Sequence, residues 1–239
     1  MEEYFEEDQF NIGTYEGERN DKNERHGMGT AVLPNGDKYS GHYQNGKRHG
    51  QGIYEFRDGA KYVGEYYENQ KHGKGEFFYP DGSKYSGDWY LDKRQGYGIY
   101  TFESGDIYEG EWFDNKRNGA GTYACKASDQ IYRCLWKNGK MNGSGYLYGT
   151  NFQFLGQWKE GYAYGNSRFL FPRLSCIQSG NFVPKYLFNE NEEQEEEKNN
   201  RSFKSIWYAS KVDVLSESDR LSIPNIPVIS PVPDEVSVK

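Results

Sequence analysis

The chain has 239 residues and a formal net charge of −7, with 29 glycines, 22 tyrosines and 17% aromatic residues. Leucine, isoleucine and valine are scarce, so the composition excludes a large aliphatic core and favours aromatic rings packed over glycine. Residues 11–185 carry 23 Lys/Arg against 20 Asp/Glu, a balance that argues against a nucleic-acid-binding protein.

The first ten residues form an acidic lead with five acids and no base. This lead lacks the basic and apolar regions of a signal peptide, and no apolar run in the chain approaches membrane-spanning length. The three cysteines cannot close a disulfide framework, and their spacing fits no metal site. We therefore expect a soluble intracellular protein that holds no metal and no cofactor.

A repeat begins after the lead, and its clearest copy is Tyr62–Gly82. A Tyr-x-Gly opening recurs every 22–24 residues, and a Gly-x-Gly pair follows each of the first six openings. Aromatic and glycine residues alternate on every second position, which is the period of a β-strand. Each copy is therefore predicted to be one β-hairpin, and the fixed period predicts an array of about seven hairpins.

The turns and glycines of each copy have distinct expected roles. In the clearest copy a polar loop covers residues 67–72, and Asp81-Gly82 predicts a type I′ turn because glycine adopts positive φ without steric cost. The periodic glycines are predicted to be structural, and they are Gly41, Gly50, Gly52, Gly64, Gly73, Gly75, Gly87, Gly96, Gly98 and Gly110.

These patterns predict an all-β fold: an elongated single-layer antiparallel ribbon of about seven hairpins with acidic, largely irregular termini. We divide the chain into the lead at 1–10, the repeat array at 11–185, and an acidic, proline-containing tail at 186–239. Gly180 and Phe182 are interpreted as the remnant of an eighth half-unit.

Within the tail, residues 202–214 have a weak helical spacing that predicts a short helix. Residues 223–233 predict an extended, polyproline-like segment. Its Pro224-x-x-Pro227 pattern fits an SH3-type groove, and a plain linker is the alternative interpretation.

Alternate aromatic residues are predicted to form one ribbon down the sheet. One interpretation is an intramolecular core. The other is a partner-binding surface, because a single-layer sheet leaves such rings within reach of a partner and exposed aromatic patches mark interfaces. The ribbon contains Tyr39, Tyr43, Tyr62, Tyr66, Tyr85, Trp89, Tyr108 and Trp112.

Two polar columns keep the same period. A basic column is predicted to line one edge of the array, either as a solvated edge that prevents pairing with other chains or as a ladder for an acidic partner or anionic lipid. It contains Arg25, Arg48, Lys71, Arg94 and Arg117. The following column begins with three histidines and continues with amides, so we expect it to hydrogen-bond its own turn; it contains His26, His49, His72, Gln95, Asn118 and Asn142.

No catalytic constellation separates from the periodic background. The Gly-x-Gly pairs do not extend to a Gly-x-Gly-x-x-Gly motif between a strand and a helix, so no nucleotide site is predicted. Cys125 and Cys134 are expected to be small buried residues and not reactive thiols. We therefore predict that the protein is not an enzyme and has no catalytic residue.

The units resemble MORN repeats (membrane occupation and recognition nexus), whose pattern is Tyr-x-Gly-x-Trp/Tyr, a loop, then His-Gly-x-Gly. Lys61–Tyr66 and Lys71–Gly75 carry this pattern closely, and the resemblance covers about residues 13–165. It implies an antiparallel β ribbon. It also implies a second possible function, in which a MORN array binds membranes and the basic column recognises anionic phospholipids.

The N-terminal copies are similar to the radial spoke head family of MORN proteins. The residues that carry this similarity are 11–17, 24–27, 33–37 and 46–54, and the acidic flanks fit as well. The resemblance implies a non-catalytic scaffold in the axoneme of motile cilia and flagella, including sperm. It implies binding to other spoke-head proteins and to central-pair projections, while a homodimer stays open, and it argues against nucleic acid or membrane as partner.

Overall fold

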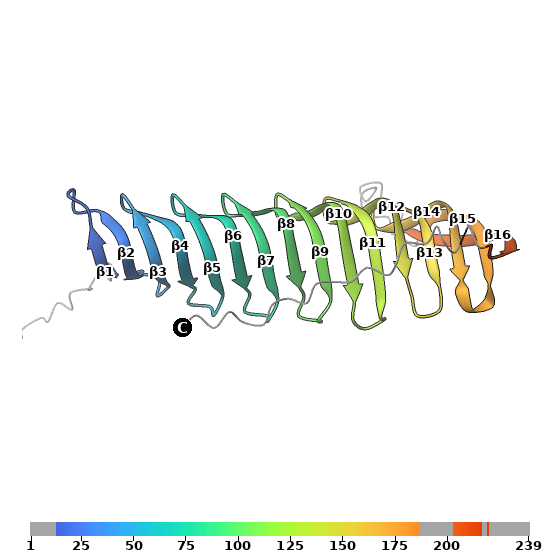
Figure 1. The fold of residues 1–239 in the computed structure, drawn as a ribbon, viewed down its shortest axis with the longest axis horizontal. Coiled ribbons are helices and arrows are strands. Elements are labelled where there is room, and N and C mark those ends of the chain that lie inside the picture. Colours follow the sequence, from blue (N-terminus) through green and yellow to red (C-terminus); the bar gives the residue numbers. More distant parts are fainter. Residues whose placement is uncertain (1–12, 187–202, 217–218, 220–239) are drawn as a thin grey trace, which may run out of the picture. The chain divides into compact units, whose positions relative to one another are not determined.

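The computed structural model describes residues 13–186, 203–216 and 219. All the strands of this part belong to one antiparallel sheet in which neighbouring strands follow the order of the chain (Figure 1). The all-β fold built from hairpin repeats is therefore confirmed. The chain divides into two compact units, residues 1–96 and 97–239, and the boundary lies within strand β8 (Lys93–Thr101).

The first unit contains three and a half hairpins. Each strand carries alternating buried and exposed positions, because every second residue of a strand faces the same side of a sheet. The strands are β1 (Thr14–Arg19), β2 (Arg25–Val32), β3 (Lys38–Gln44), β4 (Lys47–Glu55), β5 (Lys61–Tyr67), β6 (Gln70–Phe78) and β7 (Lys84–Tyr90).

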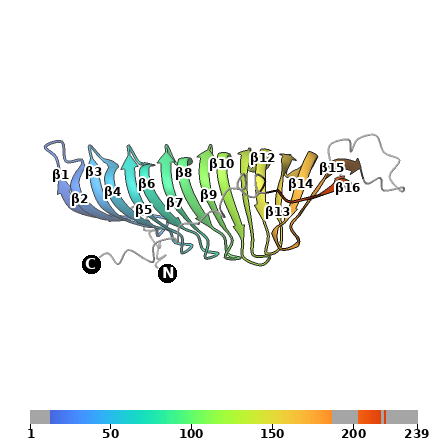
Figure 2. The same ribbon diagram turned by 45° about the vertical axis from the view of Figure 1, so that its right-hand side comes forward.

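The second unit continues the pattern and ends with the strand pair β15–β16 (Figure 2). No helix of the described residues is long and apolar enough to cross a membrane. Its elements are β9 (Ile107–Phe113), β10 (Lys116–Cys125), β11 (Gln130–Lys137), β12 (Lys140–Tyr148), β13 (Gln153–Lys159), β14 (Tyr162–Phe171), the 3₁₀ helix η1 (Pro172–Leu174), β15 (Cys176–Tyr186) and β16 (Phe203–Val214).

The type I′ turns are not where the sequence predicted them. At Asp81-Gly82 only the glycine has positive φ, and the N–H of Gly82 donates to the carbonyl of Tyr79, so the turn is a type I turn followed by a left-handed glycine. The tight turn instead joins β5 to β6, where Glu68 and Asn69 both have positive φ (46° and 73°). The predicted polar loop is thus a two-residue hairpin turn.

The core of the regular repeats is a tyrosine ring lying across two glycines on paired strands, whereas the last two copies have Cys134 and Ser167 in place of one glycine. Gly64 pairs directly with Gly75, and a Cβ on Gly64 would lie 2.5 Å from the Cα of Gly75. A Cβ on Gly75 would overlap the ring and hydroxyl of Tyr62, which is fully buried. Here glycine is required by close approach, because the φ of Gly75 is not positive. The prediction that rings pack over glycine gaps is confirmed.

The helix expected at 202–214 is wrong, because residues 203–214 form strand β16 and pair along the whole of β15. Trp207 lies 5.0 Å from the Phe182 ring and 5.1 Å from the Phe169 ring, centroid to centroid. The apolar spacing of this segment therefore serves the aromatic core of the sheet, and Gly180 and Phe182 belong to a complete final hairpin. The Pro224-x-x-Pro227 pattern lies outside the described residues.

A buried carboxylate ties neighbouring hairpins together. Asp37, which is 7% exposed, accepts hydrogen bonds from the Tyr54 hydroxyl (2.7 Å) and the Arg57 backbone N–H (2.8 Å). Burial alone would raise the pKa of Asp37, but the donated hydrogen bonds outweigh it and hold the pKa below its ordinary value. In the second unit Asp106 likewise accepts from the Tyr123 hydroxyl.

We predict that Gly75→Ala lowers the free energy of unfolding by about 3 kcal/mol, the upper part of the usual cost of overpacking. Urea unfolding measures the change. Gly46→Ala is the matched control, because no atom lies within 4 Å of its Cβ position and only its positive φ of 81° opposes alanine. We expect that control to cost about 1 kcal/mol. Equal losses would show that close packing under Tyr62 does not require glycine at residue 75.

We predict that Tyr54→Phe costs about 1–3 kcal/mol at pH 7, because Asp37 then loses one donor to its charged form. The folded pKa of Asp37 lies below its ordinary 3.8, so this stabilisation is fully present above that pH. It is lost as pH falls through the folded pKa. The free energies of unfolding of wild type and variant, measured across pH 2–7, should therefore converge in acid. The difference of about 1–3 kcal/mol at pH 7 should be largely lost there.

The chain provides a control for this pair, because Ala60 and Phe77 occupy the equivalent positions one repeat later. The double variant Asp37→Ala/Tyr54→Phe should lose less free energy than the two single variants together, by roughly 1–2 kcal/mol. Strictly additive losses would contradict the view that the two residues act as a unit.

Candidate functional site

The predicted aromatic ribbon is buried in both units. Its eight side chains are 0–6% exposed, and neighbouring rings meet edge to face, with Tyr62 lying 5.2 Å from Tyr66 and 5.4 Å from Trp89. Such contacts add to the stability gained from burial itself. The expectation that these rings lie within reach of a partner is wrong; the alternative, an intramolecular core, describes them. The eight are Tyr39, Tyr43, Tyr62, Tyr66, Tyr85, Trp89, Tyr108 and Trp112.

Each central tyrosine of the ribbon also donates a hydrogen bond within its own hairpin. The Tyr62 hydroxyl donates to the Glu65 carbonyl at 2.9 Å, and the Tyr39, Tyr85 and Tyr108 hydroxyls each donate to the carbonyl three residues onward. Burial raises the pKa of all four hydroxyls above the ordinary value. These groups therefore remain protonated donors that fix the ring over the glycines.

The basic column lies beside the hairpin turns, at the start of every second strand, and its cations cover aromatic rings instead of standing free in solvent. The Arg48 guanidinium is 4.9 Å from the Tyr54 ring and 5.2 Å from the Tyr66 ring, and the Lys71 ammonium is 5.4 Å from the Trp89 ring. In the second unit Arg117 lies 4.3 Å from the ring of Trp136. Cations placed over ring faces are held there by the ring quadrupole. Arg25 and Arg94 contact rings in the same way.

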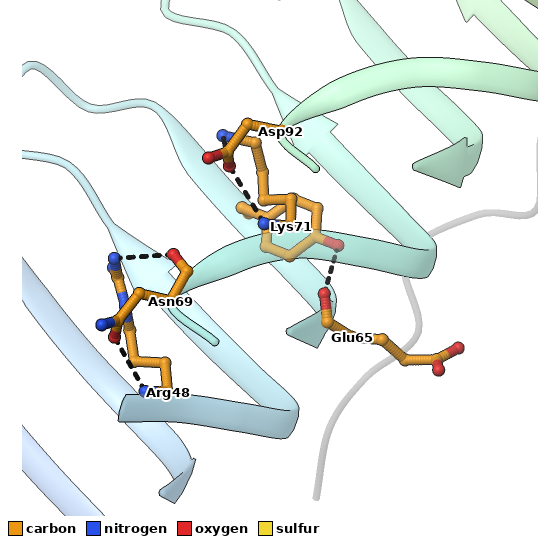
Figure 3. Close-up of polar contacts among 6 residues, drawn as sticks. Arg48, Glu65, Asn69, Lys71 and Asp92 are labelled. Carbon is orange, nitrogen blue, oxygen red and sulfur yellow. Dashed lines mark hydrogen bonds and ion pairs between the residues drawn. The ribbon is translucent and has the colours of Figure 1, made fainter. Parts of the chain in front are cut away.

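The same cations hold the turn of the next hairpin (Figure 3). The Arg48 guanidinium donates to the Asn69 carbonyl at 3.0 Å, and its backbone N–H donates to the Asn69 side chain at 2.8 Å. Lys71 repeats the arrangement with Asp92 through an ion pair of 3.2 Å and a backbone bond of 3.0 Å. Each cation therefore joins one hairpin to the type I′ turn of the following one.

In this geometry the cations of the basic column are poorly accessible to a lipid or an acidic partner. The Lys71 side chain is only 18% exposed and already paired, whereas the Lys47 side chain, outside the column, is 48% exposed. A half-buried, paired cation contributes less to long-range attraction than a free one. Both earlier interpretations of the column, a solvated edge and an anion ladder, give way to a structural role.

The histidine and amide column contacts the next hairpin, so the expectation that it bonds its own turn is wrong. His26 accepts a hydrogen bond from the N–H of Asn45, and Asn142 donates to the Glu160 side chain. Both partners lie in the type I′ turn of the following hairpin.

A row of rings with exposed tyrosines and half-buried histidines lies on the other face of the first unit, and the sequence analysis did not single it out. We define the outer ring row as His49, Tyr67, His72 and Tyr90, whose successive rings are 5.2–5.6 Å apart. Tyr67 is 48% exposed and Tyr90 is 49% exposed. A signal was available, because each tyrosine directly follows a ribbon aromatic and must therefore point to the opposite face.

Features that would support catalysis are few in the described part of the chain. No group of three or more His, Cys, Asp or Glu side chains there is placed to hold a metal. Cys134 is buried, which raises the pKa of its thiol to about 12, so it is a core residue as expected. Cys125 is half-buried. A shallow groove of about 470 Å³ on the β12–β16 side is lined by residues including Ser144, Gln157, Asn166, Arg168, Ser179 and Ser210.

The similarity to known proteins lies mainly in the repeats. The MORN repeat model matches six segments that together exceed half of the chain, at residues 21–38, 39–61, 62–84, 85–107, 108–129 and 135–152. Curated relatives named radial spoke head 1 homolog, from Cyprinus carpio and Mus musculus, are each 58% identical over 43 residues. That match is 18% of this chain, and the chain spans only 20% and 14% of those relatives.

Among solved structures, one similar chain is the Drosophila melanogaster SAS-4 TCP domain, solved in complex with a proline-rich motif of Ana2. The TM-score is 0.42 and the sequence identity 11%, over 68% of this chain and 86% of that one.

We predict that Lys71→Met lowers the free energy of unfolding by about 1–2 kcal/mol, because it removes a half-buried cation–π contact and the ion pair with Asp92, which keeps only its bond from the backbone N–H of residue 71. Urea unfolding gives the value. Lys47→Met is the control, since the ion pair of Lys47 with Glu68 is exposed and should contribute less than about 0.5 kcal/mol. If the two variants lose equal stability, Lys71 is a solvated surface residue after all.

Proposed function

Because the chain belongs to the family of MORN-repeat proteins, we propose that it is a non-catalytic scaffold of the radial spoke head in the axoneme of motile cilia and flagella. The similarity to proteins named radial spoke head 1 homolog carries this proposal. The resemblance of residues 11–17 and 46–54 to radial spoke head protein 1 (meichroacidin) supports it as well. In this role the protein supports ciliary and sperm motility by holding other spoke-head subunits.

The arrangement of side chains suits a scaffold. Rings, glycines and cations that repeat along the chain are used to build and join hairpins, so each repeat is held by its neighbours. The outer ring row remains on the surface, and tyrosine exposed in this way is typical of residues that dominate protein interfaces. We propose that this row contacts another spoke-head subunit.

Central-pair projections and a second copy of this chain are further proposed partners. Both involve protein surfaces, and tyrosine is enriched in the core of protein interfaces. The membrane-binding alternative gains no support from the basic column, whose cations are committed to rings and turns.

We predict that the full chain, expressed with a tag in motile ciliated cells, stays with the axoneme after detergent removes the membrane. Tyr67→Ser/Tyr90→Ser should reduce the retained fraction by about tenfold or more, since buried interface tyrosines commonly contribute 2 kcal/mol or more each. Immunoblots of detergent and axoneme fractions give the readout, and cross-linking of the retained material identifies the subunits in contact.

Tyr164→Ser/Tyr208→Ser is the control, because it removes two tyrosines that are 45% and 57% exposed in the second unit. Its retention should match wild type. Extraction of the wild-type protein entirely into the detergent fraction would contradict the scaffold proposal. Equal retention of the Tyr67/Tyr90 variant would contradict the role of the outer ring row alone.

A further inference from the structure

A row of directly paired residues crosses the second face of the sheet, opposite the aromatic ribbon, and its chemistry differs between the units. In the first unit it alternates between charged and apolar residues, because Lys38, Glu55, Lys61 and Lys84 share it with Val32 and Phe78. In the second unit the equivalent positions from β9 to β15 are mainly apolar, interrupted by Gln153, and Asp213 of β16 ends the row. We call this the apolar row; it contains Ile107, Ala124, Ile131, Tyr148, Leu170 and Ile177.

The chain that leaves β16 turns back onto this row. Leu215 is 5% exposed and forms a small core with Leu170 and Ile177, and its N–H donates to the Ser175 carbonyl at 2.8 Å. Four residues later Asp219 lines one small hollow together with Arg168, Leu155 and Tyr146, which belong to β14, β13 and β12. That hollow also includes Leu170 and Ile177, so both Leu215 and Asp219 lie on this face of the sheet over β12–β15.

We propose that the next segment of this chain, residues 220–239, docks along the apolar row toward β9. The segment supplies apolar side chains at Leu221, Ile223, Ile226, Val228 and Ile229. Ile107, Ala124 and Ile131 of the row are half-buried, so docking against them removes apolar surface of both from water.

Length and hydrogen bonding both fit this occupant. Strands lie about 4.8 Å apart, so the distance from β14 to β9 is roughly 24 Å, which about eight extended residues cover. Twenty residues follow Asp219 in the sequence. The Tyr148 hydroxyl is buried without a hydrogen-bond partner, and a proline-containing segment presents backbone carbonyls that are free to accept from it.

A photo-crosslinking residue at position 226 of the full chain tests the proposal. After irradiation and digestion, mass spectrometry should locate the cross-links in second-face residues of β9–β13, with a yield that does not change on dilution. Cross-links between two chains, cross-links confined to other surfaces, or an absence of cross-links would each overturn the proposal.

Ile107→Lys/Ile131→Lys is the disruptive variant. The chain already carries Lys61 and Lys84 at equivalent positions, so the sheet tolerates lysine there. Because an ammonium group is costly to bury in an apolar site, the cross-link yield should fall by about tenfold or more. Gln157→Lys, at an exposed position of the second face outside the row, should leave the yield unchanged.

A second measurement, by NMR, does not depend on cross-linking. In methyl NMR spectra, the Ile131 and Ile107 signals should shift when the chain is shortened to end at Asp219, whereas the Ile53 signal of the first unit should not. Unchanged Ile131 and Ile107 signals would overturn the proposal. This outcome is separate from the spoke-head proposal, which concerns the outer ring row of the first unit.

Discussion

The close approach of a tyrosine ring to a pair of glycines is the constraint on which the regular repeats depend. Gly64 and Gly75 face each other across two strands, and Tyr62 covers both. A side chain at either glycine would lift the ring and expose the flat surface that the next aromatic contacts. The Tyr62 ring contacts both Tyr66 and Trp89. A displaced Tyr62 ring therefore also weakens the packing of the following hairpin, to which Trp89 belongs. The repeat period is thus set by packing and not by turn chemistry.

Coupling between hairpins depends on cations that perform two tasks at once. Lys71 covers the ring of Trp89 and also holds Asp92, which lies in a turn with positive φ. A non-glycine residue in that conformation is strained, and the bonds from Lys71 offset part of this cost. This explains why turns such as Leu91-Asp92 form tightly without the Asn-Gly signal, and why the basic column keeps the period of the sheet.

Sequence periodicity was sufficient to predict the hairpins and the packing of rings over glycine, because both depend on neighbours at fixed separations. It did not predict the turn at Glu68-Asn69, since its bonds come from Arg48, a residue of the previous hairpin. The basic column was expected to be solvated or to bind anions for the same reason: position on a strand does not reveal which ring lies beneath a long side chain. Residues 203–214 form a strand because β15 offers a partner, a non-local effect that overrides weak local spacing.

The two faces of the sheet therefore have different roles. The ribbon face repeats with little change because it must hold the structure, whereas the second face is free to vary from one repeat to the next. It presents exposed tyrosines in the first unit and apolar residues from Ile107 onward in the second. A face that need not stabilise the hairpins is the one on which binding specificity can be placed, since substitutions there leave the ring and glycine contacts intact. An accessible surface for one partner and an apolar row for a segment of the same chain are then compatible uses of a single repeated scaffold.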